Sequence, residues 1–253
     1  MITFTEAQVL AWITPLLWPF LRALALFSVM PVLGTRMVPT RVRIGLAALV
    51  AFAAQPALPP MPEVALDSPL AFMLVAQQVL IGVTLGFAVR LVFAAVEFAG
   101  ELIGLQMGLN FAGFFDPLSA SAATATSRFF GTTVAWLFIV INGHLLVLAA
   151  LADSFTVFPV GPEPFAFLRT TRPHLWGAEI FSTGLWIALP ILTMLLFVNL
   201  VLGAISRVAP QINIFAIGFP VTLGVGLLGL LLTLPALSQP FTMTLERLLE
   251  QFR

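Results

Sequence analysis

Glu97 and Glu101 are the only two acidic residues that share one apolar segment at helical spacing. A spacing of four places both carboxylates on one helix face, as general acid–base catalysis would need. The rest of the sequence argues against such chemistry. It contains no Lys and no Cys, so it has no amine or thiolate nucleophile. It also lacks the HExxH, GxSxG and GxxxxGKS/T motifs. We therefore predict that the protein is not an enzyme.

The chain has two histidines, His144 and His174, and no cysteine. So few potential nitrogen and sulfur ligands argue against a metal site of that kind, and we expect no cofactor. His144 follows Asn142 and Gly143 within an apolar segment. We interpret these three residues as a hydrogen-bonded packing notch, because a proton relay would want a carboxylate near His144 and the local sequence has none.

Arg22 and Arg90 are two further charged residues within apolar segments. For Arg22 two interpretations are open: it pairs inside a helical bundle, or it reaches toward a membrane interface. Arg90 and Glu97 are seven residues apart and so share one helix face. Contacts with other helices or lipid headgroups are the favoured interpretation for this pair, and lining of a wet channel is the alternative.

The composition indicates a protein of the membrane. Of 253 residues, 60% are hydrophobic and 9% are charged, and the mean hydropathy is +1.08. Soluble domains carry about 25% charged residues. We predict an all-α, multi-pass membrane protein of kinked helical hairpins. The formal net charge is zero and no basic tail is present, so no nucleic-acid partner is expected.

Six apolar segments are expected to form the helices. They cover residues 7–32, 44–54, 70–110, 129–152, 185–205 and 214–237. The second is too short to span a bilayer, so it either extends back to Pro39 or forms a short buried helix, and the fourth is predicted to be one spanning helix. The third would be about 60 Å long, so it either breaks near residues 90–100 or projects beyond the hydrocarbon. Residues 153–183 are predicted to form an irregular connection, and residues 244–253 an amphipathic helix at an interface.

The stretch from residue 97 to 128 is unlike its apolar surroundings. Gly100, Gly104 and Gly108 form a ridge at four-residue spacing, which in lipid allows helices to approach closely. Residues 111–127 are rich in small side chains. Such a loop between membrane helices is tolerated only where protein or a water-filled cavity covers its backbone. We predict that it lines or closes a pathway, with Phe114 and Phe115 for sealing.

Several motifs resemble the FliR family of type III export proteins. They are PVLGTRMVPTRVRIGLA at 31–47, ELIGLQMGLNFAGFFDP at 101–117, INGHLLVLAAL at 141–151, the long block at 188–220 and the Pro-rich link near 159–165. The resemblance covers nearly the whole chain. The injectisome counterpart shares much of the pattern and is the alternative; a small-molecule permease is a further one.

The resemblance implies a pore-forming subunit of the flagellar export gate in the bacterial inner membrane, at the basal body. Its implied partners are the P and Q subunits (FliP and FliQ), the B subunit (FlhB), membrane lipid and unfolded export substrates. Residues 1–152 would resemble the P subunit, and residues 153–253 the Q subunit plus a tail. The implied pore plug consists of Phe111, Gly113, Phe114, Phe115, Asp116 and Pro117. Arg207, Pro210 and Gln211 would lie at the cytoplasmic entrance.

Overall fold

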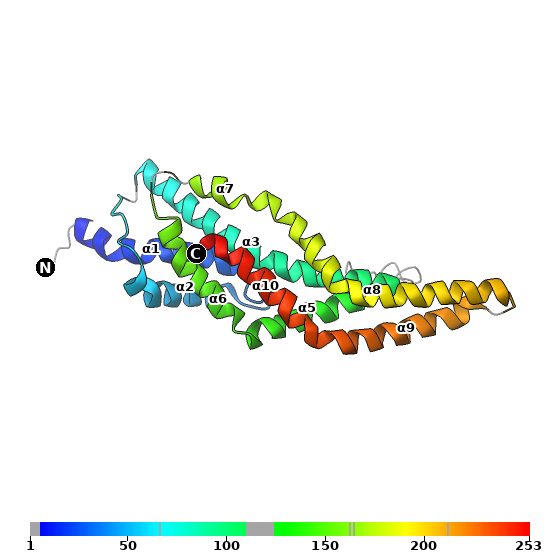
Figure 1. Cartoon of the computed structure of the whole chain (residues 1–253). Coiled ribbons are helices and arrows are strands. Elements are labelled where there is room, and N and C mark those ends of the chain that lie inside the picture. The colour runs from blue at the N-terminus through cyan, green and yellow to red at the C-terminus, as the bar shows by residue number, and fades with distance from the viewer. Residues whose placement is uncertain (1–5, 66, 110–123, 162, 164, 212) are drawn as a thin grey trace. The chain divides into compact units, whose positions relative to one another are not determined.

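The computed structural model describes residues 6–65, 67–109, 124–161, 163, 165–211 and 213–253, and these form helices joined by turns (Figure 1). The α-helices are α1 (Glu6–Val29), α2 (Thr40–Ala54), α3 (Pro69–Gln106), α5 (Ala125–Val140), α6 (Gly143–Val157), α7 (Ala166–Thr171), α8 (Gly177–Val208), α9 (Ile214–Thr233) and α10 (Ser238–Leu249). Short 3₁₀ helices are η1 (Gln55–Ala57), η3 (Pro173–Leu175), η4 (Leu234–Leu237) and η5 (Glu250–Phe252). The described residues include no β-strand, so the all-α prediction is confirmed.

Within the described residues, four helical stretches are long and apolar enough to cross a membrane. They are Trp12–Val29, Pro69–Gln106, Gly177–Val208 and Ala216–Phe252. A fifth is counted if α5 and α6 form one broken span. The protein is therefore an all-α membrane protein, with fewer candidate spans than its six apolar segments.

Two of the expected segments differ from a simple spanning helix. The third is the continuous 38-residue helix α3, so it does not break near residues 90–100. The fourth was predicted to be unbroken, and that prediction is wrong: α5 ends at Val140 and α6 begins at Gly143. The break follows from the backbone of Asn142, which is left-handed at φ 58° and so cannot continue a right-handed helix.

The contacts divide the chain into two compact units. Unit 1 contains Met1–Leu91, Asn142–Trp176 and Leu245–Arg253, and unit 2 contains Val92–Ile141 and Gly177–Thr244. Helices α3 and α10 each contribute residues to both units. The units interleave along the chain, whereas the P-like and Q-like regions follow chain order, so that division into residues 1–152 and 153–253 stays a prediction.

Arg22 of α1 is the polar centre of unit 1, and its side chain is fully buried. Its Nε donates to Gln78 Oε1 of α3 at 2.8 Å. One Nη donates to the Ser154 carbonyl and hydroxyl oxygens at 2.8 and 2.9 Å, and the other to the Phe158 carbonyl at 3.0 Å. The guanidinium lies 3.7 Å from the centre of the Phe155 ring. Of the two interpretations open for Arg22, the structure selects the one inside the bundle.

These contacts place the Arg22 cation at the C-terminal end of α6. The last carbonyls of a helix have no partner within it, and they form the negative end of its dipole. Arg22 meets both needs, because it donates to those oxygens and brings positive charge to them. Helices α1, α3 and α6 are thereby joined by one side chain.

The C-terminal tail also belongs to the interior of unit 1. Leu245, Leu248 and Phe252 are at most 3% exposed. The Phe252 ring packs edge-on against Phe158 and Trp176, with both centroid distances at 6.1 Å. The predicted interfacial helix is therefore wrong in its location: its apolar side is covered by aromatic side chains of this chain. The 153–183 connection is likewise more regular than predicted, since α6 continues to Val157 and α7 and η3 follow.

We expect Arg22→Met to destabilise the protein by about 3–5 kcal/mol, because it removes four hydrogen bonds and takes away the donor to Gln78 Oε1 and to the Phe158 carbonyl, whereas the Ser154 carbonyl keeps the Phe158 N–H. Thermal unfolding of the detergent-purified protein measures this loss. Arg169→Met is the matched control, because Arg169 is exposed on α7. Equal unfolding temperatures for the two variants would contradict the role assigned to Arg22.

Candidate functional site

The predicted plug residues Phe111, Gly113, Phe114, Phe115, Asp116 and Pro117 lie outside the described residues. Both ends of the segment that carries them are described, and both lie in unit 2. The site is therefore built here from its two ends, Met107 on the upstream side and Thr124 on the downstream side.

Met107 holds the upstream end against α9. It follows the last residue of α3 and is completely buried. Its side chain occupies the space over Gly226, where an added Cβ would lie 2.5 Å from Cγ and 2.7 Å from the sulfur. The Thr222 hydroxyl, one helical turn earlier on α9, lies 3.4 Å from the Met107 carbonyl oxygen and 3.1 Å from the Gly218 and Phe219 carbonyl oxygens of its own helix, so the Met107 carbonyl is the most distant of its three acceptors. Gly108 then turns the chain out of the helix with a φ of 81°, a conformation that suits glycine.

Thr124 holds the downstream end against α3. Its hydroxyl accepts from the Ser127 backbone N–H at 3.2 Å and so caps the start of α5. The same hydroxyl donates to Glu101 Oε2 at 2.9 Å, and the Thr124 backbone N–H donates to that oxygen at 3.3 Å. The Glu101 carboxylate thus lies at the N-terminus of α5, where the helix dipole favours negative charge.

Two glycines of the predicted ridge lie where α3 meets the first turns of α5. A Cβ at Gly100 would be 2.9 Å from both Ser127 Cα and the Thr126 carbonyl oxygen. A Cβ at Gly104 would fall on the Thr126 hydroxyl. The Ser127 hydroxyl donates to the Glu97 carbonyl at 3.1 Å across this contact. Gly100 and Gly104 therefore allow close approach of the two helices, while Gly108 serves the turn described above.

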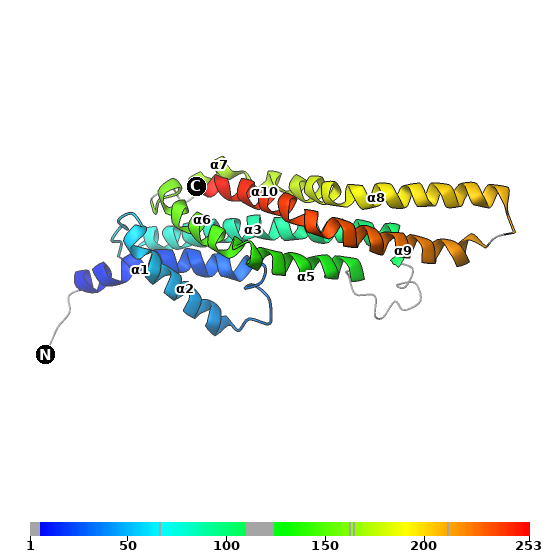
Figure 2. The ribbon, with the colours of Figure 1, turned by 60° about the horizontal axis from the view of Figure 1, so that its bottom comes forward.

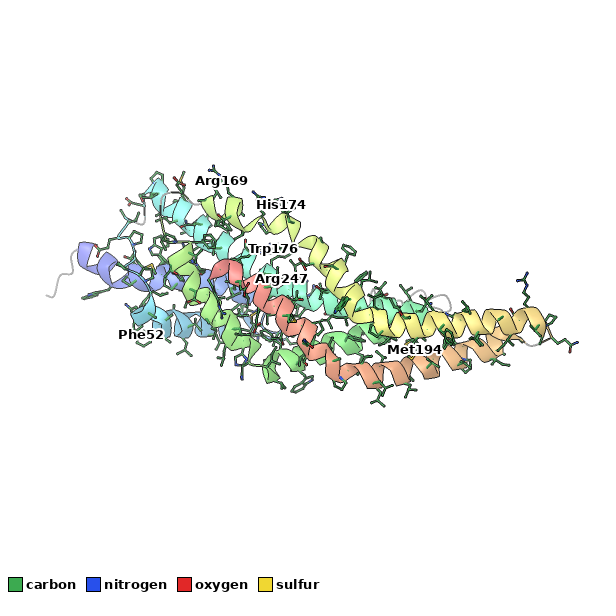
Figure 3. All side chains as sticks on the ribbon, in the orientation of Figure 1. Phe52, Arg169, His174, Trp176, Met194 and Arg247 are labelled. Carbon is green, nitrogen blue, oxygen red and sulfur yellow. The ribbon has the colours of Figure 1, made fainter. Side chains whose placement is uncertain are left out.

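The predicted entrance residues lie at the turn between α8 and α9, the hairpin tip in Figure 1. Arg207 is in the last turn of α8, and Pro210 and Gln211 follow before α9. All three are exposed. The two arms of the hairpin contact each other through Met194 of α8, labelled in Figure 3, whose methyl group occupies the space over Gly229 of α9.

The other polar residues that the sequence singled out have plain structural surroundings. Glu97 is exposed on α3, and one of its carboxylate oxygens would lie 3.0 Å from a Cβ at Gly131 of α5. Arg90 is exposed on the same helix. Asn142 stands at the N-cap position of α6 without a capping bond from its side chain, and the buried Gly143 begins the helix, so these residues mark a helix break instead of a notch within one helix.

Sequence reasoning did not find Met107, Thr124, Thr222 or Gly226 as parts of this site. Thr124 stands directly before the first residue of α5, and this position carried a usable signal, since Thr is a preferred N-cap. No local signal identifies Gly226 as the neighbour of Met107, because the two are more than a hundred residues apart. Among the described residues no group of His, Asp and Glu could hold a metal ion. What the arrangement can do is fix the two ends of one segment.

Comparison with known proteins shows that the chain is similar to one protein family over nearly its whole length. The model of the family "Bacterial export proteins, family 1" matches residues 13–248. The flagellar biosynthetic protein FliR of Escherichia coli (strain K12) is 46% identical over 244 residues, which cover 95% of this chain and 92% of that protein. The FliR protein of Pectobacterium carotovorum subsp. carotovorum has the same identity and coverage. That of Bacillus subtilis (strain 168) is 28% identical over 90% of both chains.

We expect Gly104→Ala to destabilise unit 2 by about 1–3 kcal/mol, because the new methyl group displaces the Thr126 hydroxyl and pushes α5 from α3. Thermal unfolding in detergent gives the measurement. Adding Thr126→Ala should recover most of the loss by making room.

Gly203→Ala is the matched control for this change. Gly203 is also helical, but a Cβ there would meet no atom within 4 Å. Its replacement should leave stability unchanged or raise it by up to about 1 kcal/mol. Equal changes in unfolding temperature for Gly104→Ala and Gly203→Ala would show that the close contact between α3 and α5 does not limit side-chain size at Gly104.

Proposed function

The chain belongs to the FliR family of bacterial export proteins, and on that premise we propose that it is a pore-forming subunit of the flagellar protein export gate. Membership of the flagellar export apparatus follows from the family, and the apolar helices make the chain a bacterial multi-pass membrane protein. The finer proposal adds three points. The subunit assembles with FliP and FliQ, it lies in the inner membrane at the basal body, and it closes the channel with its own plug.

The observation that carries the plug is the anchoring of its two ends. Met107 is held by α9 and Thr124 by α3, and sixteen residues lie between them. Its composition supports a stopper, since small residues outnumber bulky ones and aromatic side chains are available for sealing. We assign the plug to Phe111, Gly113, Phe114, Phe115, Asp116 and Pro117.

The surface of the α8–α9 hairpin supports assembly with sister subunits. Large apolar side chains along it are exposed, including Phe197, Leu200 and Leu231 at 67–71%. In lipid, helices associate through close packing and polar contacts, because apolar surface alone gives no drive. Close packing is possible at Gly203 of α8, which is exposed, and Ser206 one turn on is a half-buried hydroxyl beside it. We propose that it packs against FliQ and FliP, and that its tip at Arg207, Pro210 and Gln211 meets FlhB at the cytoplasmic entrance.

Two further considerations support this function over the alternatives. The relatives named above are flagellar proteins, which favours the flagellar system over an injectisome. Their names describe biosynthesis and export and no catalysed reaction, which supports a non-enzymatic role. The transported species are then unfolded flagellar export substrates, and membrane lipid is the remaining partner.

We expect Phe114→Ala combined with Phe115→Ala to raise ion leakage through the closed complex several-fold, because the aromatic seal is lost. Deletion of residues 113–122 should raise it further. The measurement is ion flux through proteoliposomes that contain the chain co-purified with FliP and FliQ.

Phe165→Ala is the control for this experiment, because Phe165 is an exposed phenylalanine in a connection of unit 1. It should leave the leakage at the parent level. Unchanged leakage in both plug variants, with co-purification intact, would reject the plug while leaving the gate-subunit assignment standing. Failure of the parent chain to co-purify with FliP and FliQ would reject the assembly itself.

A further inference from the structure

The turn between α1 and α2 is the most positively charged part of the chain. Arg36, Arg41 and Arg43 lie within eight residues, and no acidic residue occurs between Glu6 and Glu63. The turn and the two helices all belong to unit 1. In Figure 2 they form a hairpin, with α2 on the outer side of α1.

The three arginines do not share one role. Arg43 folds back on the turn and donates to the Thr35 and Val38 carbonyls at 2.9 and 3.0 Å. It therefore fixes the shape of the turn. Arg36 and Arg41 are exposed, and neither makes an ion pair within the described part of the chain. Their charges are available to a partner.

Helix α2 continues from this charged turn with an apolar outer face. It packs against α1 through the buried Ala47 and Ala51. Val42, Leu49 and Phe52 follow helical spacing on the other side and are 47%, 62% and 66% exposed. Phe52 points outward in Figure 3. Met37 in the turn is 92% exposed.

The length of α2 limits what can cover this face. Fifteen residues make a helix of about 22 Å, which is shorter than the roughly 30 Å hydrocarbon core. A helix of this length reaches part of the way into a bilayer, with its charged end among the headgroups and its apolar side among the acyl chains. Guanidinium groups bind phosphate oxygens well, and a cluster of basic residues next to a membrane helix attracts anionic lipid.

We propose that the α1–α2 turn and the outer face of α2 bind anionic phospholipid, with Arg36 and Arg41 on the headgroup phosphates and Val42, Leu49 and Phe52 against the acyl chains. A soluble acidic partner would match the two arginines but would leave the apolar face uncovered. A second copy of this chain would bring arginine against arginine. Anionic lipid satisfies both halves of the surface. The proposal is independent of the plug.

The chain has no cysteine, so Met37→Cys creates a single thiol for a fluorescent label at the turn. The labelled full-length protein is reconstituted in lipid discs that contain brominated phosphatidylglycerol or brominated phosphatidylcholine, which quench a nearby fluorophore. We expect stronger quenching by phosphatidylglycerol in the parent. Each arginine near an anionic surface contributes roughly a fivefold preference, so Arg36→Gln with Arg41→Gln should lower the preference by up to about 25-fold.

The matched control is Arg169→Gln with Arg172→Gln. These arginines are exposed on another part of unit 1, and their replacement removes the same charge. The control should keep the preference for phosphatidylglycerol, and molar salt should abolish that preference in the parent. Equal quenching by the two lipids in the parent, or equal loss in both double variants, would overturn the proposal. So would a label that neither lipid quenches while Arg36→Gln with Arg41→Gln blocks assembly, because the surface would then bind protein.

Discussion

Among the described residues, two helix ends form hydrogen bonds with charged side chains that come from another helix. Glu101 of α3 accepts the first N–H of the α5 cap, and Arg22 of α1 donates to the last carbonyls of α6. In each case the sign of the charge matches the helix dipole. Groups that face water can leave such bonds to the solvent, but in hydrocarbon or a dry core the protein must supply them. In the described part of a chain with only 9% charged residues, Glu101 and Arg22 serve in this way.

Small residues decide where its helices meet closely. The start of α5 packs against Gly100 and Gly104, and the Met107 side chain packs against Gly226. Without a hydrophobic drive between helices in lipid, such contacts rely on backbone proximity and fitted side chains. Their combined effect in unit 2 is to fix both ends of the segment proposed to close the channel.

Much of the fold could be predicted from the sequence, and the failures share a cause. The apolar segment at 214–237 matches α9 and η4, and the segment at 185–205 lies within α8, which begins eight residues earlier at Gly177; apolar length alone is enough to indicate these helices but not where α8 begins. The break after Val140 was missed, because its apolar flanks outweighed the single Asn at the left-handed position. The tail was expected at an interface because its amphipathic pattern shows only that one face of the helix must lie against apolar groups. The pattern cannot show that Phe158 and Trp176 supply them.

Composition and motif order by themselves determined that this is an all-α membrane protein of the FliR family, since those properties are summed along the chain or read in short blocks. Tertiary structure alone decided the partners of Arg22 and Met107. Arg22 bonds residues 132 and 136 positions away, and Met107 contacts a glycine more than a hundred residues later. From the sequence alone, a charged residue in an apolar segment or a glycine in a helix indicates only that some other residue must pack against it. Which residue meets that need depends on how distant helices come together, because the contact forms in space and leaves no local pattern.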